Sequence, residues 1–261
     1  MFQFVEDEYI MLLWIIATLG AFFIKGLCGF ANTLVFTSIL AFGTTNINIS
    51  PVELVLGYPT NFVLAWKNRR KLDKRIFVPL SFLVILGSLP GAFLLKNISS
   101  GNIKIVFGIL VTLLGTDMLM REYDILHFNE SKLILGIIGV ISGVFCGMFG
   151  VGALLAAYIG RVTDSGDEFK ANISAVFIVE NTFRVILYGV MGIITVNSVK
   201  QSLILIPFMI AGLWAGIKCS KIIDDRVVRI LVIVLLIISG VVMIVNNLQI
   251  LSEKASSALC R

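Results

Sequence analysis

The chain has 261 residues, of which 58% are hydrophobic and only 14% charged, and its mean hydropathy is +0.99. A soluble domain carries roughly a quarter charged residues, so this composition excludes an ordinary soluble protein and indicates a polytopic membrane protein. The net charge of +5 comes mostly from basic residues in short loops. This pattern is typical of membrane topology, and we expect no nucleic-acid partner.

Apolar segments long enough to cross a bilayer recur along the chain and predict membrane-spanning helices. They fall near 9–43, 51–66, 76–95, 103–120, 132–160, 171–191, 201–218 and 228–248. The start MFQFVEDE is acidic, whereas a secretion signal starts with basic residues. We therefore expect the first apolar segment to be a retained membrane helix.

Two of these segments, 9–43 and 132–160, are too long for one crossing. A continuous helix over 9–43 would span about 50 Å, against a hydrocarbon core of roughly 30 Å. Each contains a glycine-rich stretch, Gly26-Leu-Cys-Gly29-Phe-Ala or Gly147-Met-Phe-Gly150-Val-Gly152, and glycine is a poor helix former. Such glycines can serve close helix packing alone, but their recurrence in both overlong segments favours broken or re-entrant helices.

The two long segments open two similar halves, 1–125 and 126–261, which together form one transmembrane domain. Around Asn61, Tyr-Pro-Thr-Asn-Phe corresponds to Val-Glu-Asn-Thr-Phe around Asn181. The Gly87–Gly91 stretch corresponds to Gly212–Gly216, and for these glycines we expect helix packing. The predicted fold is an all-α polytopic membrane protein of two inverted repeats, each with a Gly-broken or re-entrant first helix followed by three spanning helices.

The distribution of basic residues predicts the topology. If each long segment makes two passes, the loops 67–75, 121–132, 161–170 and 218–229 share one side and hold fourteen of the 21 lysines and arginines. This arrangement satisfies the positive-inside rule better than a single pass for each long segment. It gives each half an odd number of crossings and so inverts the second half. We expect a multi-pass protein of the cell membrane, with loop 67–75 cytoplasmic and both termini outside.

Polar residues inside the apolar segments are candidate ligands, because charge at membrane depth is costly. Lys25 directly precedes the first break, with snorkelling to an interface as the alternative. Glu180, the candidate coupling carboxylate, stands four residues before Arg184, a spacing that also suits a purely structural ion pair. The predicted substrate-binding residues are Lys25, Gly26, Gly29, Asn32, Thr33, Asn61, Gly147, Gly150, Gly152, Asn181 and Arg184.

Half-helices that begin inside the membrane present backbone N–H groups and partial positive charge, which favour an anion. The four cysteines have no C-x-x-C spacing and the single His127 has no partner motif, so no metal and no cofactor is expected. No P-loop is present. A lipid-modifying enzyme would need a nucleophile and a base at membrane depth, and we do not expect an enzyme.

The paired glycine-rich breaks, the Asn61…Lys67-Asn-Arg-Arg-Lys-Leu-Asp73 end of an early helix and the run Asn181-Thr-Phe-Arg184 resemble the sulfite exporter TauE/SafE family of membrane transport proteins. The resemblance covers nearly the whole chain. It implies transport of a small anion, typically sulfite, an organosulfonate or a related sulfur oxyanion. Alternating access between inverted repeats is the expected mechanism.

Two alternatives remain at this stage: an anion channel of the same architecture and, more remotely, a membrane-embedded lipid-modifying enzyme. A channel would share the fold but lack alternating access. The expected partners are the small anionic substrate and membrane lipids, and a second copy of the chain, as in a homodimer, is a candidate.

Overall fold

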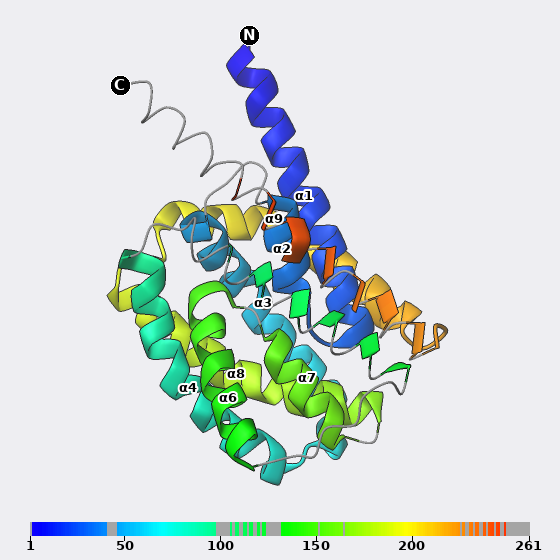
Figure 1. Ribbon diagram of the computed structural model, residues 1–261. Helices are drawn as coiled ribbons and strands as arrows, with labels where there is room; N and C mark the ends of the chain where they lie inside the picture. Colours follow the sequence, from blue (N-terminus) through cyan, green and yellow to red (C-terminus); the bar gives the residue numbers. More distant parts are fainter. Residues whose placement is uncertain are drawn as a thin grey trace.

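The computed structural model describes residues 2–40, 46–97 and 132–224 apart from 151 and 164, with separate positions between 105 and 123 and between 226 and 248 (Figure 1). Within these residues all regular structure is helical, which confirms the all-α class. The helices are α1 (Phe2–Cys28), α2 (Asn32–Leu40), α3 (Asn46–Lys67), the short 3₁₀ helix η1 (Arg69–Lys71), α4 (Lys74–Asn97), α6 (Lys132–Phe149), α7 (Ala153–Val162), α8 (Gly166–Val190) and α9 (Val196–Cys219).

Both predicted helix breaks are confirmed. α1 ends at Cys28, and α2 begins again at Asn32. Between them Gly29 and Ala31 have φ of 90° and 67°, left-handed values that interrupt a right-handed helix. α6 and α7 are separated in the same way at Gly150, whose φ is 73°. Glycine adopts such angles without steric cost, which is why the chain uses it there.

The order of helices is the same in the two halves. In each half a long helix is followed by a short one of 9 or 10 residues and then by two helices of 22 to 25 residues. The predicted segments 103–120 and 228–248 are described only at separate positions. Two of their described residues lie close together: a Cβ added to Gly108 would be 2.7 Å from the carbonyl oxygen of Gly240.

The first helix of each half packs against the fourth helix of the other half, α1 against α9 and α4 against α6. Figure 1 shows α1 running beside α9. Glycines make both contacts: Gly212 and Gly216 lie against the backbone of α1, and Gly87 and Gly91 lie against the backbone of α6. The expected packing role of these four glycines is confirmed, because a Cβ at any of them would meet the facing backbone.

The third helices of the two halves, α3 and α8, run antiparallel to each other. The Ser50 hydroxyl group forms a hydrogen bond of 3.1 Å with that of Tyr188, near the start of α3 and the end of α8. Further along α3, the hydroxyl group of Tyr58 lies 2.7 Å from that of Thr182. The residue numbers therefore rise on one helix as they fall on the other.

The outer faces of the long helices are apolar, as a lipid environment requires. Four of the described helical segments are long and apolar enough to cross a membrane: Ile10–Cys28, Lys74–Leu95, Gly166–Val190 and Val196–Cys219. Large exposed apolar side chains include Leu12, Ile16, Phe82, Leu86, Phe93, Ile186, Leu203, Ile204, Ile210 and Trp214. A hydrophobic surface of this extent would be unstable in water and is stable in a bilayer.

The basic loops approach one another at one end of the molecule. Partial burial together with the neighbouring charges of Lys170 and Lys221 lowers the pKa of Lys67. Arg226 forms an ion pair with Glu122, at 3.5 Å between Nε and Oε1. These electrostatic interactions involve all four loops that the charge count assigned to one side.

Candidate functional site

A buried ion pair lies where the two helix breaks come together. Nη2 of Arg184, on α8, is 3.2 Å from Oε2 of Glu53, on α3, and the two side chains are 1% and 3% exposed. Removing two charges from water costs several kcal/mol for each ion, and the attraction between them compensates only when their other polar atoms also have partners. The surroundings of both side chains supply most of those partners.

The Glu53 carboxylate is held by the start of α2. Its Oε1 atom accepts a hydrogen bond of 2.6 Å from the Asn32 amide and one of 2.7 Å from the Thr33 hydroxyl. Asn32 and Thr33 are the first two residues after the first break, at the positive end of the short helix. Two residues predicted to bind an external anion thus bind a carboxylate of the chain itself.

Arg184 connects this carboxylate to the second break. Its Nη1 atom donates a hydrogen bond of 2.7 Å to the Cys146 carbonyl, near the end of α6. Gly150, in the break, lies so close that an added Cβ would be 2.8 Å from both Nη2 of Arg184 and Oε2 of Glu53. The hydrogen bonds therefore run from the first break through Glu53 and Arg184 to the second.

Glu180 is a weaker partner of Arg184 than the sequence suggested. Its Oε1 atom is 3.7 Å from Nε of Arg184, within ion-pair range but too long for a hydrogen bond. Among the described residues neither of these two atoms has a hydrogen-bond partner. The structure favours the cross-helix pair with Glu53 over the pair within α8.

Lys25 lies inside the protein. Its side chain is 2% exposed, and its ammonium group donates a hydrogen bond of 3.3 Å to the carbonyl oxygen of Gly57 on α3. Gly57 also adjoins the ion pair, because a Cβ added to it would lie 2.8 Å from Oε1 of Glu53. The Lys25 ammonium group therefore reaches the face of α3 that carries Glu53, and it is directed into the protein.

Asn61 on α3 and Asn181 on α8, which the sequence comparison of the two halves aligned, are both buried. Asn61 is 1% exposed, and within the described part of the chain neither its amide nitrogen nor its amide oxygen has a hydrogen-bond partner. Buried amides are nearly always paired, because an unpaired one costs about 1–3 kcal/mol. Asn61 thus has unused donor and acceptor capacity two turns along α3 from Glu53.

The other predicted glycines face protein atoms. Gly26 lies against the backbone of α9, Gly147 against Ser88 of α4, Gly152 against the ring of Phe177, and Gly29 against the side chain of Lys170. The Gly147 carbonyl also accepts a hydrogen bond of 2.8 Å from the Tyr188 hydroxyl. Of the predicted glycines, Gly150 is the one that the structure brings to the charged pair.

Glu53 is not among the residues predicted from the sequence, in which Glu180 is the one expected coupling carboxylate. Glu53 ends a charge-free run that begins at Gly26, two residues after Pro51, and there it resembles the polar boundary of a segment. Its position inside the predicted segment 51–66 was the available signal. A carboxylate within such a segment is a functional candidate by default.

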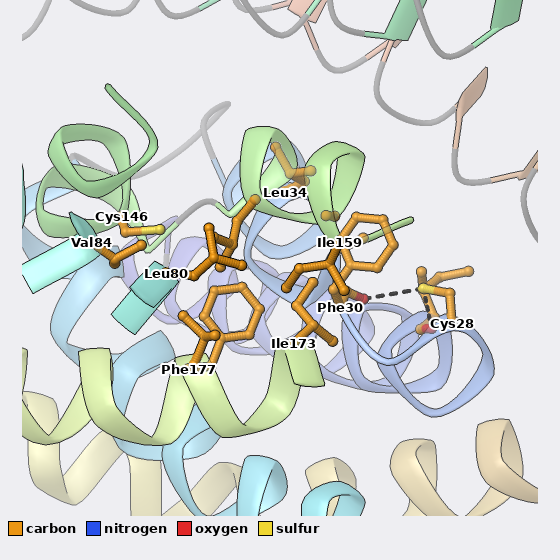
Figure 2. Close-up of a cluster of buried hydrophobic side chains, with 14 of the residues drawn as sticks. Cys28, Phe30, Leu34, Leu80, Val84, Cys146, Ile159, Ile173 and Phe177 are labelled. Carbon is orange, nitrogen blue, oxygen red and sulfur yellow. Dashed lines mark hydrogen bonds between the residues drawn. The ribbon is translucent and has the colours of Figure 1, made fainter. Parts of the chain in front are cut away.

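An apolar cluster separates the ion pair from the basic-loop end of the molecule. Figure 2 shows Phe30, Leu34, Leu80, Ile159 and Phe177 converging from four helices and the first break. On α8 the cluster side chains precede Glu180 and Arg184, and on α4 they follow directly after the basic loop. Along these two helices the cluster therefore lies on the loop side of the charged groups.

Cys28 and Cys146 belong to the same cluster, and both are buried. The Cys28 thiol lies 3.2 Å from the carbonyl oxygen of Phe30, the contact drawn as a dashed line in Figure 2. Their burial is typical of small packing residues. No group of three or more His, Cys, Asp or Glu side chains suited to a metal ion occurs among the described residues.

Helices interrupted within apolar segments, an apolar outer surface and a buried charged cluster at the interruptions are typical of membrane proteins with discontinuous helices, which include many secondary transporters. A family model described as Sulfite exporter TauE/SafE matches residues 13–243. The chain belongs to this family of membrane transport proteins. No curated protein and no solved structure matches the chain.

Proposed function

We propose that this protein is a secondary transporter of a small anion, with sulfite, an organosulfonate or a related sulfur oxyanion as substrate, that works by alternating access between two inverted repeats. The observation that carries the proposal is the position of Arg184. This buried cation is joined to the first helix break through Glu53 and to the second break through the Cys146 carbonyl.

The chemistry of these groups suits an oxyanion. The planar guanidinium of Arg184 presents several N–H donors in a fixed geometry that matches carboxylates and other oxyanions. The side chains of Asn32 and Thr33 already donate to one carboxylate oxygen. The buried amide of Asn61 offers further donors. Together with family membership, these groups favour a sulfur oxyanion over a cation or a neutral solute.

Two features support the inverted arrangement of the repeats. The equivalent helices α3 and α8 run antiparallel, as the hydrogen bonds from Ser50 and Tyr58 indicate. In a repeat related by an axis along the membrane normal, equivalent helices would run in the same direction. The reciprocal packing of α1 on α9 and α6 on α4 gives the two halves equivalent surroundings.

The apolar cluster shown in Figure 2 supports a transporter over an open anion channel. It packs between the charged pair and the basic loops, which the positive-inside rule places in the cytoplasm. Separation of these side chains would connect the charged pair with the loops. Export of an anion from a negative-inside cell is favoured by about 2.3 kcal/mol per charge for each 100 mV, whereas uptake needs a coupled ion.

The first test is the thermal midpoint of the purified protein across sulfite, sulfate, thiosulfate, sulfoacetate, phosphate, bicarbonate and chloride at constant ionic strength. An anion present at 100 times its dissociation constant stabilises the folded state by about 2.7 kcal/mol. We expect a sulfur oxyanion to raise the midpoint most, and Arg184→Gln to abolish the increase. Arg226→Gln is the matched control, because Arg226 is 60% exposed.

A second measurement separates transporter from channel. Liposomes loaded with the unlabelled anion should accumulate labelled anion by exchange, and the rate should saturate with concentration. Flux that rises without saturation and shows no exchange would establish the channel instead. An equal response of wild type and Arg184→Gln to every anion would refute the proposed site.

A further inference from the structure

The Glu53 carboxylate makes the contacts that a bound oxyanion would make. One oxygen accepts from Asn32 and Thr33, and the other faces the Arg184 guanidinium at 3.2 Å. Asn32, Thr33 and Arg184 are also donors that could bind an incoming anion. An incoming anion could use them only if Glu53 gave them up or shared them.

Sharing of these donors between Glu53 and an incoming anion is unfavourable because of the charge balance. Among the described residues, the titratable and charged groups that interact with Glu53 are Lys25 on α1, Cys146 on α6, and Glu180, Arg184 and Tyr188 on α8. With both carboxylates ionised, two cations face two anions and no net positive charge remains. A second anion beside an ionised Glu53 would place like charges together in a buried site, which is strongly disfavoured.

We propose that Glu53 is an internal anion that occupies the substrate position when the site is empty, and that the substrate replaces it when Glu53 takes up a proton. This inference rests on the proposed function and identifies the coupling group of the same site. One proton moves from water to a Glu53 oxygen for each anion bound. The neutral acid no longer attracts Arg184, so the guanidinium is available to the substrate.

Glu180 does not fit this role. It lies 3.7 Å from Arg184, and its Oε1 atom accepts no hydrogen bond from the described residues. It has no bond to the start of α2, so its protonation would leave Asn32 and Thr33 occupied by Glu53. Because Glu180 is equally buried, Glu180→Gln is the matched control for Glu53→Gln.

The experiment measures the affinity for sulfate and methanesulfonate, whose charge is constant over the range tested, as a function of pH. With one proton taken up per anion, wild-type affinity should weaken by up to about tenfold per pH unit where Glu53 is ionised. Glu180→Gln should keep this slope. Glu53→Gln, permanently neutral, should bind with little dependence on pH and more tightly than wild type at alkaline pH.

A second readout uses the wild-type protein and so does not depend on folding of the variant. In weakly buffered solution, anion binding should take up close to one proton per anion, detected with an indicator dye. No proton uptake, an unchanged pH slope in Glu53→Gln, or loss of all binding in a folded Glu53→Gln overturns the inference while leaving the transporter proposal intact. Absence of binding by wild type at every pH would overturn both.

Discussion

Replacing Gly150 by alanine tests whether the second helix break and the buried ion pair form one structural unit. The φ of Gly150 is 73°, and a left-handed conformation costs an L-residue about 1–2 kcal/mol. The added Cβ would also lie 2.8 Å from Nη2 of Arg184 and from Oε2 of Glu53. Both partners are buried and hydrogen-bonded, so they cannot move aside without losing contacts.

Gly192→Ala is a control that separates these two effects. Gly192 has a φ of 69°, and a Cβ added to it meets no atom within 4 Å, so the control introduces only backbone strain. We expect Gly192→Ala to lower the free energy of unfolding by about 1–2 kcal/mol. Deleting one partner of a buried ion pair costs about 3–5 kcal/mol. Gly150→Ala displaces the pair but leaves both partners present, so this part of the loss should be smaller. We expect backbone strain and displacement together to lower the free energy of unfolding by about 3–5 kcal/mol.

The assay is thermal unfolding of the two variants in the same detergent, followed by the anion panel. Gly150→Ala should show the larger loss of thermal midpoint and little stabilisation by any sulfur oxyanion, whereas Gly192→Ala should respond to anions like wild type. Equal losses in the two variants, with normal anion binding in Gly150→Ala, would show that the break and the pair are independent.

Three further predictions test the packing and the ligands. Gly216→Ala should lower the thermal midpoint because its Cβ would meet the backbone of α1. In the control Gly20→Ala the Cβ meets nothing within 4 Å, and helix propensity should raise the free energy of unfolding by up to about 1 kcal/mol. Equal midpoints in the two variants would refute the packing role. Lys25→Gln should weaken anion binding in a direct titration and lower the thermal midpoint, because it removes one of the two buried cations that balance Glu53 and Glu180, whereas Lys200→Gln, on an exposed position of α9, should leave both unchanged. Asn61→Ala should cost little stability, since Asn61 loses no hydrogen bond to the described residues, yet lower the affinity for sulfate; undiminished affinity would exclude Asn61 as a ligand.

The helix breaks could be predicted from the sequence because their cause is local. Gly29 and Gly150 stand in segments too long for one crossing, and both adopt left-handed angles in the structure. The first residues of the following half-helices, Asn32 and Ala153, fall where the glycines end. Glycine conformation and segment length are properties of a few neighbouring residues, so a single sequence contains them.

The partner of Arg184 could not be predicted in the same way. Spacing along α8 favours Glu180, four residues earlier, whereas the closer carboxylate is Glu53, which is 131 residues away in the chain. This pairing exists because α3 crosses α8 antiparallel at the required register, and register between distant helices is set by tertiary packing. The same limit explains why the glycine matches indicated packing but did not identify which helices pack together.

The two kinds of helix contact have different consequences for the proposed mechanism. α1 with α9 and α4 with α6 touch backbone to backbone at glycines, so a shift along either interface would create clashes, and each pair should move as a rigid unit. The α3–α8 interface is instead formed in part by side-chain pairs such as Ser50 with Tyr188 and Glu53 with Arg184, which can exchange partners by rotamer changes. Each rigid pair joins the broken helix of one half to the fourth helix of the other half. When the fourth helix of one half moves, the broken helix of the other half therefore moves with it. Rearrangement at the α3–α8 interface is therefore the step at which binding of an anion beside Arg184 can be coupled to a change of access.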